Sequence, residues 1–277
     1  PNKWTYYKLE LPTKIEKTAK ASKPIPLKFN EYYIGNNVSD SNKFNKLRVC
    51  QISDCHVDTP FTANELKRLC QHIVKFNPDL VLLTGDFYYT KNDDIPKGLL
   101  KYALSPLTDI ADKCYACLGN HDIKTKKTKD DIETCIVSEF KKLNIKLLRN
   151  ESILHDENTE IIGFDFVKDN KCNKRSNMMK NVLKESKLNG DGLRIVLLHN
   201  PFDFDDFDGN ENILVFSGHI HGGHVGFYAL GSWFRDTSLL RMLFRNKCPQ
   251  DYGVWRKGNN LMYIHRANTL YSKGLLR

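Results

Sequence analysis

The chain has 277 residues, a formal net charge of +9, 40% hydrophobic residues and 11% aromatic residues. This composition is typical of a globular protein and excludes a disordered, fibrous or coiled-coil chain, and the length suits one large α/β domain or two small ones. Apolar runs such as Leu80–Leu83 and Ile195–Leu198 have strand length, far below the roughly 18 residues of a membrane span. We expect a cytoplasmic or peripheral membrane protein. The start at Pro1 leaves open an upstream membrane anchor.

The eight cysteines are too few for a disulfide scaffold. Cys114-x-x-Cys117 has metal or redox spacing, but its apolar surroundings and the lack of a second such pair favour a buried strand. The densest basic runs, Lys124–Lys129 and Lys168–Lys180, lack the interleaved aromatic residues of a nucleic-acid stacking surface. They predict solvated loops, with a positive rim that attracts an anionic substrate or an acidic membrane surface as the alternative.

Residues 1–46 form a polar N-terminal extension, in which the alternating stretch Trp4–Leu11 predicts an edge strand. From Leu47 onward, apolar strands alternate with amphipathic helices. Thr62-Ala-Asn-Glu65 is typical of a capping box and predicts a helix start, and Asn77-Pro78-Asp79 ends that helix. The later predicted helices are 97–109, 130–143 and 177–187. The predicted strands are 47–53, 80–84, 114–118, 146–148, 153–155, 160–164, 193–198, 213–216 and 261–265. This alternation predicts an α/β fold of stacked layers, with sheet enclosed by helices.

Polar side chains follow five of these strands directly. The motifs are Asp54-Cys-His56, Gly85-Asp86, Gly119-Asn-His-Asp122, His199-Asn200 and Gly218-His-Ile-His-Gly-Gly223. Because ligands in such folds gather at the carboxyl ends of the strands, these side chains can meet although they are distant in sequence. A lone histidine at a strand end is usually a hydrogen-bonded structural residue, so the prediction rests on the joint pattern. Seven oxygen and imidazole ligands exceed the four that one zinc ion takes, which indicates two divalent ions (Mn, Fe, Zn or Mg, with Mn favoured).

The order of these motifs resembles the calcineurin-like metallophosphoesterase superfamily over roughly residues 47–277. Ser53–His56 and Gly218–Gly223, with Tyr263-Ile-His-Arg266, are most similar to a bacterial branch of membrane-associated phosphohydrolases. That branch includes enzymes that act on the pyrophosphate of UDP-diacylglucosamine. The resemblance implies a layered α/β/β/α sandwich, in which two mixed sheets are flanked by helices.

The resemblance also implies residue roles. The implied metal ligands are Asp54, His56 and His221 for one ion, Asn120, His199 and His219 for the other, and Asp86 as the bridge. His121 matches the histidine that contacts the phosphoryl group and protonates the leaving oxygen, and Asp122 is expected to hold His121 by a hydrogen bond. Water between two cations loses a proton readily, so the expected reaction is hydroxide attack on phosphorus without a covalent enzyme intermediate.

Several residues and segments allow two interpretations from the sequence. His224 stands where the related branch commonly has Gln, and it is either a further polar group at the site or a surface residue. The insertion Phe227–Tyr252 predicts either a helix packed on the core or an amphipathic lid or interfacial helix that meets acyl chains. The acidic stretch Asp203–Asp208 predicts a solvated loop, with a third metal site as the alternative. Cys55 lies between two expected ligands and is given no role.

The expected function is therefore a two-metal phosphoesterase that acts on a phosphate ester or pyrophosphate. Its expected partner is a phosphorylated small molecule or lipid, with peripheral membrane contact as an option, and we expect a monomer. One alternative is a phosphodiesterase or nuclease, although a nucleic-acid substrate is not favoured. The other is a non-catalytic scaffold of the same fold. Such a scaffold is expected to lose ligands or the histidine after Gly-Asn, whereas this chain keeps both.

Overall fold

The computed structural model describes residues 8–10, 30–32, 47–57, 60–88, 97–123, 132–167, 172–188, 192–221 and 253–267. The chain divides into two units, Pro1–Arg48 and Val49–Arg277. In the first unit, β1 (Lys8–Glu10) pairs antiparallel with β2 (Asn30–Tyr32). Over the described ranges, no helix has both the length and the apolar character to cross a membrane.

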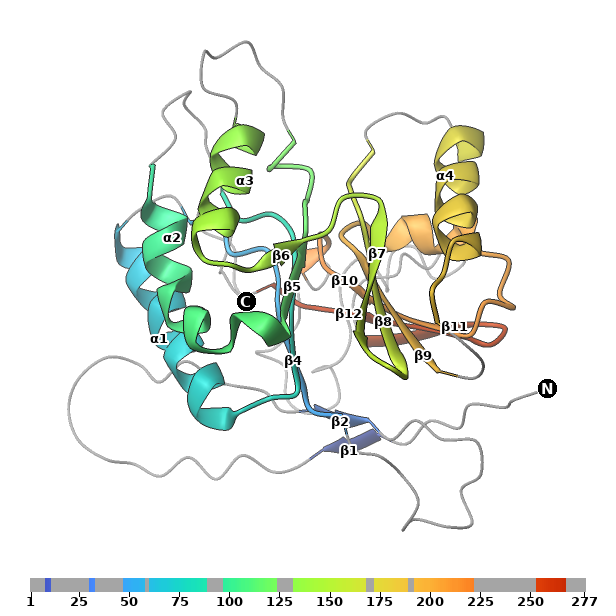
Figure 1. Ribbon diagram of the computed structural model, residues 1–277, viewed down its shortest axis with the longest axis horizontal. Coiled ribbons are helices and arrows are strands. Elements are labelled where there is room, and N and C mark those ends of the chain that lie inside the picture. The colour runs from blue at the N-terminus through green and yellow to red at the C-terminus, as the bar shows by residue number, and fades with distance from the viewer. Residues whose placement is uncertain are drawn as a thin grey trace, which may run out of the picture. The chain divides into compact units, whose positions relative to one another are not determined.

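A four-stranded parallel sheet forms the first half of the second unit (Figure 1). Its strands, in spatial order, are β3 (Val49–Ile52), β4 (Leu80–Thr84), β5 (Cys114–Cys117) and β6 (Lys146–Leu147). The helical segments on its outer side are α1 (Pro60–Phe76), α2 (Leu99–Leu104), the 3-10 helix η2 (Ser105–Lys113) and α3 (Ile132–Lys142). β4 and β5 are buried along their whole length, as is usual for central parallel strands. The strand prediction for Cys114–Cys117 is confirmed, and both thiols are free.

The second half contains a six-stranded mixed sheet in the order β11-β12-β10-β9-β8-β7. The strands are β7 (Glu151–Asp156), β8 (Thr159–Phe164), β9 (Leu193–Leu198), β10 (Ile213–Ser217), β11 (Gly253–Lys257) and β12 (Asn260–Ile264). The four central strands run parallel, and β7 and β11 pair antiparallel at the edges. Helix α4 (Cys172–Lys184) and the 3-10 helix η3 (Pro201–Asp206) lie on the outer side of this sheet. The predicted α/β/β/α sandwich is confirmed (Figure 1). Of the two sheets expected to be mixed, the described strands of the first are all parallel and only the second is mixed.

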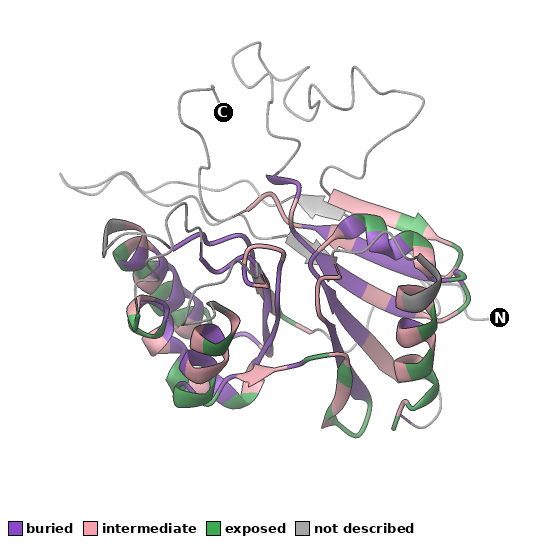
Figure 2. Ribbon diagram, turned by 90° about the horizontal axis from the view of Figure 1, so that it is seen from above, coloured by how far each residue is buried: buried purple, intermediate pink, exposed green. Residues whose placement is uncertain are grey.

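Burial follows the layers. Figure 2 shows buried residues along the strands and exposed residues on the outward helix surfaces. In the second sheet, Ile162, Val196 and Val215 from three neighbouring strands belong to one buried cluster with Met179 of α4 and Phe204 of η3. The core on this side of the sandwich therefore joins the parallel strands to the helical layer that covers them.

The start of α1 was predicted wrongly, and one strand of the second unit was missed. Helix α1 begins at Pro60, so Thr62 lies inside its first turn and cannot be its capping residue. Proline is favoured at the first helical position, where a backbone N–H would have no partner within the helix. Strand β11 was not predicted, because most of its residues are only half-buried and it lacks an apolar alternation. It pairs only with β12, at the edge of its sheet.

Glu139 on α3 caps the start of α2. Its buried carboxylate accepts hydrogen bonds from the backbone N–H groups of Gly98 at 2.6 Å and Lys101 at 2.7 Å. The hydroxyl of Tyr88 donates to the same carboxylate at 3.2 Å and accepts from the N–H of Leu100 at 2.9 Å. The N–H groups in the first turn of a helix have no partner within it, so this network supplies acceptors that the helix itself lacks.

We expect the substitution Glu139→Ala to lower the free energy of unfolding by about 3 kcal/mol, because it removes the buried carboxylate that accepts charge-assisted hydrogen bonds from Gly98, Lys101 and Tyr88. Glu139→Gln keeps one acceptor oxygen, so its loss is smaller. Urea denaturation measures both values. Glu157→Ala, at an exposed position in the β7–β8 turn, is the control and changes stability by less than about 0.5 kcal/mol. Equal stability of the Glu139→Ala and Glu157→Ala variants would contradict the capping role.

Candidate metal centre

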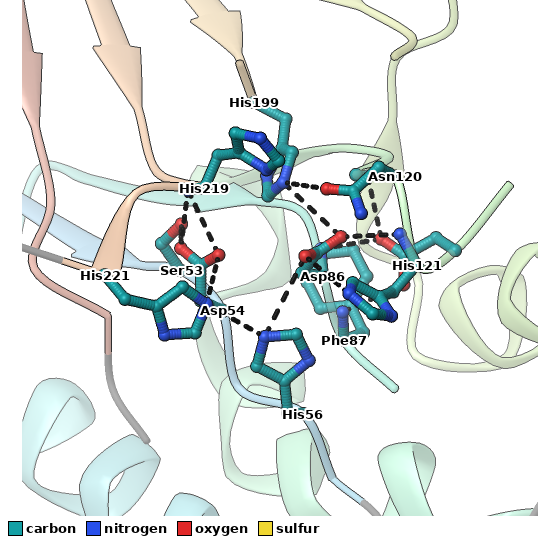
Figure 3. A network of polar contacts seen from close by, with 12 residues as sticks. Ser53, Asp54, His56, Asp86, Phe87, Asn120, His121, His199, His219 and His221 are labelled. Atoms are coloured by element: carbon teal, nitrogen blue, oxygen red, sulfur yellow. Dashed lines mark hydrogen bonds and ion pairs between the residues drawn. The ribbon is translucent and has the colours of Figure 1, made fainter. Parts of the chain in front are cut away.

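The residues expected as metal ligands lie together at one edge of the sandwich (Figure 3). Each follows the carboxyl end of a parallel strand. Asp54 and His56 follow β3, Asp86 follows β4, Asn120 follows β5, His199 follows β9, and His219 and His221 follow β10. Both sheets therefore supply side chains to one cluster, as the positions of the motifs predicted.

Asp54, His56 and His221 form a first group. One potential ligand atom from each lies within 4.8 Å of the others, and all three residues are buried. His221 Nε2 is 3.3 Å from Asp54 Oδ1 and 3.1 Å from His56 Nε2. Two ligands that bind one ion at about 2.1 Å and at right angles lie about 3.0 Å apart. These donor separations therefore fit a single cation held by all three side chains.

Asp86, His199 and His219 form a second group, again with ligand atoms within 4.8 Å of one another. His199 Nε2 is 3.4 Å from Asp86 Oδ1 and 3.1 Å from Asn120 Oδ1. The other ring nitrogen, His199 Nδ1, lies 2.7 Å from the carbonyl oxygen of Thr84. A carbonyl can only accept, so Nδ1 carries the proton of the neutral ring, and Nε2 can direct a lone pair at a cation.

Asp86 lies between the two groups (Figure 3). Its Oδ2 is 3.8 Å from His56 Nε2 in the first group, and its Oδ1 is 3.4 Å from His199 Nε2 in the second. The backbone N–H of His121 donates to Oδ1 at 2.8 Å, which fixes the orientation of the carboxylate. Each oxygen of Asp86 therefore faces a different group.

The strand exits are tightly packed around these carboxylates. A Cβ atom on Gly119 would collide with Asp86 Oδ1, and one on Gly218 would collide with Ser53 Oγ and Asp54 Oδ2. Positive φ angles occur at several expected ligands, namely Asp54 (53°), His56 (44°), Asp86 (56°), His219 (72°) and His221 (50°). Non-glycine residues adopt this conformation at a cost of about 1 kcal/mol or more each, and such strain is concentrated at functional sites.

The electrostatics of the cluster favour an added positive charge. Burial opposes ionisation of Asp86, yet the charge and hydrogen bond of His199 outweigh it and lower the pKa of Asp86 to about 2. Burial alone would also lower the pKa of His199, but the charge of Asp86 raises it to about 10. Burial lowers the pKa of His56 and of His219 to about 4, so both rings are neutral at pH 7. Ionised carboxylates and neutral imidazoles form a donor set that suits divalent cations.

His121 and Asp122 occupy different positions in this arrangement. The His121 side chain is 20% exposed, and its Nε2 lies 3.9 Å from Asp86 Oδ2. The Asp122 carboxylate is buried and accepts backbone N–H bonds from Asp86 (2.7 Å), Phe87 (2.9 Å) and Gly119 (2.8 Å). Within the described ranges, these backbone groups take the place of the expected hydrogen bond to His121. Asp122 thus holds the exits of β4 and β5 together.

Two residues near the cluster were missed as contributors by the sequence analysis. Ser53 Oγ donates to Asp54 Oδ2 at 2.6 Å and so orients that carboxylate. His265 follows β12, and its backbone N–H donates to the carbonyl of Ser217 at 2.8 Å. Burial lowers the pKa of His265 to about 4, while the nearby charge of Asp54 opposes this shift. The available signal was its place directly after a strand that runs parallel to β10.

The solvated-loop prediction for Asp203–Asp208 is wrong, because most of this stretch lies in η3 and three of its side chains are buried. Asp203 lies in η3, is 2% exposed and forms an ion pair with Arg175 Nη1 at 2.7 Å. The side chains of Phe204 and Phe207 in the same stretch are buried and draw it into the core. Among the described residues, the acidic stretch is not one of the groups that could hold a metal. The solvated-loop prediction for Lys168–Lys180 is wrong from Cys172 onward, where helix α4 begins. His224, Lys124–Lys129 and the insertion 227–252 lie outside the described residues.

A family model, the calcineurin-like phosphoesterase, matches residues 47–223. The chain belongs to the calcineurin-like phosphoesterase family. Members of this family typically bind divalent metals, and this chain has two candidate groups for them. The predicted family is therefore confirmed.

Three similar proteins illustrate the range of relatives. YkoQ of Bacillus subtilis, an uncharacterized metallophosphoesterase, is 30% identical over 210 residues, which cover 71% of this chain and 67% of that protein. UDP-2,3-diacylglucosamine pyrophosphatase LpxG of Chlamydia trachomatis is 34% identical over 84 residues, 30% of this chain and 25% of LpxG. The match thus spans a quarter of LpxG. Yfce, a phosphoesterase from E. coli of known structure, has 12% identity and a TM-score of 0.39, and the alignment covers 82% of this chain and 84% of Yfce.

The position of Asp86 generates a prediction on metal content. We expect Asp86→Ala to lose both ions, because each oxygen of this carboxylate faces one group. Elemental analysis after loading with Mn²⁺ and gel filtration measures the number of ions per chain. Asp112→Ala, at an exposed position before β5, is the control and retains the wild-type content. Retention of a full pair by the Asp86→Ala variant would show that Asp86 is dispensable.

Proposed function

We propose that this protein is a two-metal phosphoesterase that hydrolyses a phosphate ester or a pyrophosphate, with residues 47–277 as the catalytic domain. The observation that carries the proposal is the Asp86 carboxylate, whose oxygens lie 3.8 Å from His56 Nε2 and 3.4 Å from His199 Nε2. A carboxylate between two donor groups can bridge two cations at the separation of about 3.5–4 Å that two-metal hydrolysis at phosphorus uses.

In this proposal Asp54, His56 and His221 hold one ion, Asn120, His199 and His219 hold the other, and Asp86 bridges them. The mixture of imidazole and carboxylate ligands suits a cation of intermediate hardness, and we favour Mn²⁺. When bound, the ions supply Lewis acidity and a water molecule acidic enough to act as a nucleophile near neutral pH.

His121 is the proposed proton donor to the leaving oxygen. Its side chain is partly open to solvent, and its ring lies edge-on to His56 with centroids 5.1 Å apart, beside the first ligand group. A substrate phosphoryl group at the centre would therefore be within reach of Nε2. Asp122 acts indirectly, because its three backbone hydrogen bonds fix the backbone of Asp86 and Phe87 and the start of the Gly119–Asp122 loop.

For the substrate we propose a phosphorylated small molecule or a lipid-linked phosphate or pyrophosphate. Support comes from the partial similarity to LpxG, which is named as a UDP-2,3-diacylglucosamine pyrophosphatase. A lipid-linked substrate would bring the protein to a membrane surface as a peripheral partner. We propose that one chain forms a complete site, since both ligand groups are assembled within it.

The test of this function is hydrolysis by the purified chain with Mn²⁺ and with a chelator. We expect release of phosphate or nitrophenol from p-nitrophenyl phosphate, bis(p-nitrophenyl) phosphate or a lipid pyrophosphate, and loss of that activity with the chelator. DNA is the fourth substrate and is expected to stay intact. Preferential cleavage of DNA would favour a nuclease instead. A metal-loaded chain that hydrolyses none of these substrates would support the scaffold alternative.

His121→Ala is expected to lower kcat about 100-fold, the effect of losing a general acid, while both ions remain bound. The measurements are initial rates with p-nitrophenyl phosphate and elemental analysis of the same preparation. His72→Ala, on the exposed face of α1, is the matched control and keeps the wild-type rate. Loss of metal from the His121→Ala variant would instead identify this residue as a ligand.

A further inference from the structure

Phe166 borders the second group of candidate ligands. In the pairing of β8 with β9, Phe164 lies opposite Leu198, so the residues that follow the two strands emerge at the same edge. The centroid of the Phe166 ring lies 6.4 Å from that of His199 and 6.2 Å from that of His219. Phe166 is only half-buried. Part of an aromatic side chain therefore remains accessible directly beside the candidate metal centre.

The backbone that carries Phe166 is held in place by its neighbour Asp165. The guanidinium of Arg149 donates to Asp165 Oδ2 from Nε at 2.8 Å and from Nη2 at 2.7 Å. The N–H of Asp165 donates to Asn150 Oδ1 at 3.1 Å, and Arg149 also pairs with Glu133 of α3 at 2.6 Å. Charge-assisted contacts of this kind are the stronger class of hydrogen bond. They hold the chain on one side of Phe166 and so limit the positions that its ring can take.

The chemistry of Phe166 differs from that of the ligands beside it. A phenyl ring neither binds a hard cation nor transfers a proton, but it offers apolar surface and an aromatic face to a bound molecule. Specificity sites combine a few polar groups that fix the reacting centre with apolar surface that receives the rest of the ligand. The ring is held at the rim of the second group, where a group attached to the phosphorus could reach it.

We propose that Phe166 is a specificity-determining residue that binds the apolar group attached to the substrate phosphate. This inference rests on the proposed function. The candidate substrates have an apolar leaving group in common, which could be an aromatic ring or an alkyl chain. An aromatic group would gain from ring–ring contact in addition to hydrophobic burial, whereas an alkyl chain would gain from burial alone.

The experiment compares three phosphate monoesters with Mn²⁺-loaded protein: p-nitrophenyl phosphate, octyl phosphate and glycerol phosphate. In the Phe166→Ala variant, we expect kcat/KM for the two apolar esters, each divided by that for glycerol phosphate, to fall about tenfold relative to wild type. Differences in intrinsic reactivity between the esters cancel in this comparison. Phe166→Leu retains apolar surface without an aromatic face, so it separates the contribution of ring–ring contact from that of hydrophobic burial. It lowers the ratio for the aryl ester alone if ring contact dominates, and it restores both ratios if burial dominates.

Two further variants sharpen the test. Phe76→Ala removes the same atoms from a 37% exposed phenylalanine at the end of α1, beside the amino end of β4, and leaves the ratios unchanged. Arg149→Ala releases the contact to Asp165 without altering Phe166, and we expect it to lower the ratios about threefold. Metal content is measured for each variant, because a ring that merely supports His199 and His219 would lower metal content and slow all three esters equally.

The outcomes are distinct. A tenfold fall in the ratios with wild-type metal content supports the role of Phe166. Unchanged ratios, or an equal loss for all three esters, overturn it while the proposed function stands, provided that the wild-type protein hydrolyses the esters. A wild-type protein that hydrolyses none of the three with Mn²⁺ overturns the proposed function and this inference together.

Discussion

The site depends on how closely the exits of neighbouring strands approach one another. Gly85, with a φ of 87°, is packed so closely against Gly119 that a Cβ atom on it would lie 2.5 Å from the Gly119 nitrogen. Asp122 reinforces this approach with hydrogen bonds to backbone N–H groups on both exits. Asp86 is therefore held from its own backbone and from the adjacent loop, and its two oxygens are directed to opposite sides. Without this close contact, the two groups of donors would not share a carboxylate.

At this edge, burial disfavours the charged forms of both the carboxylates and the imidazoles, and the opposite charges of the two kinds of group stabilise each other. Desolvation penalises the ionised form of Asp86, and His199 offsets this penalty by holding positive charge beside it. The pKa of His199, raised to about 10, shows that the position attracts a positive charge strongly. A divalent cation would interact with the same negative carboxylates more strongly, because it carries a greater charge. It would need His199 in its neutral form, since only a neutral ring can act as a ligand. The carbonyl of Thr84 prepares that ring by fixing the proton on Nδ1.

Sequence patterns predicted the parts of the molecule in which one strong signal dominates. For the buried parallel strands Leu80–Thr84 and Leu193–Leu198, the predicted boundaries equal the observed ones. Short, mainly apolar runs between polar residues define the ends of such strands clearly. The proximity of the residues that follow those strands could also be predicted, because parallel strands end at the same edge of a sheet. Contacts that depend on side-chain direction were not predictable. The spacing of Asp122 from His121 does not reveal that its oxygens turn to backbone N–H groups, and nothing in the composition of Asp203–Asp208 indicates the ion pair with Arg175.

Each candidate ion would be bound by both sheets. The first sheet contributes Asp54 and His56 to one group and the second contributes His221, while Asp86 and His199 make the same connection in the other group. A cation in either position therefore cross-links the two halves of the sandwich. The native state binds such an ion and the unfolded chain lacks the assembled site, so binding stabilises the folded domain by an amount that grows with the logarithm of free metal. The positive φ angles of the proposed ligands raise the energy of the metal-free protein, and binding of the proposed ions would offset that cost. Metal occupancy and the packing of the two sheets are thus one coupled equilibrium.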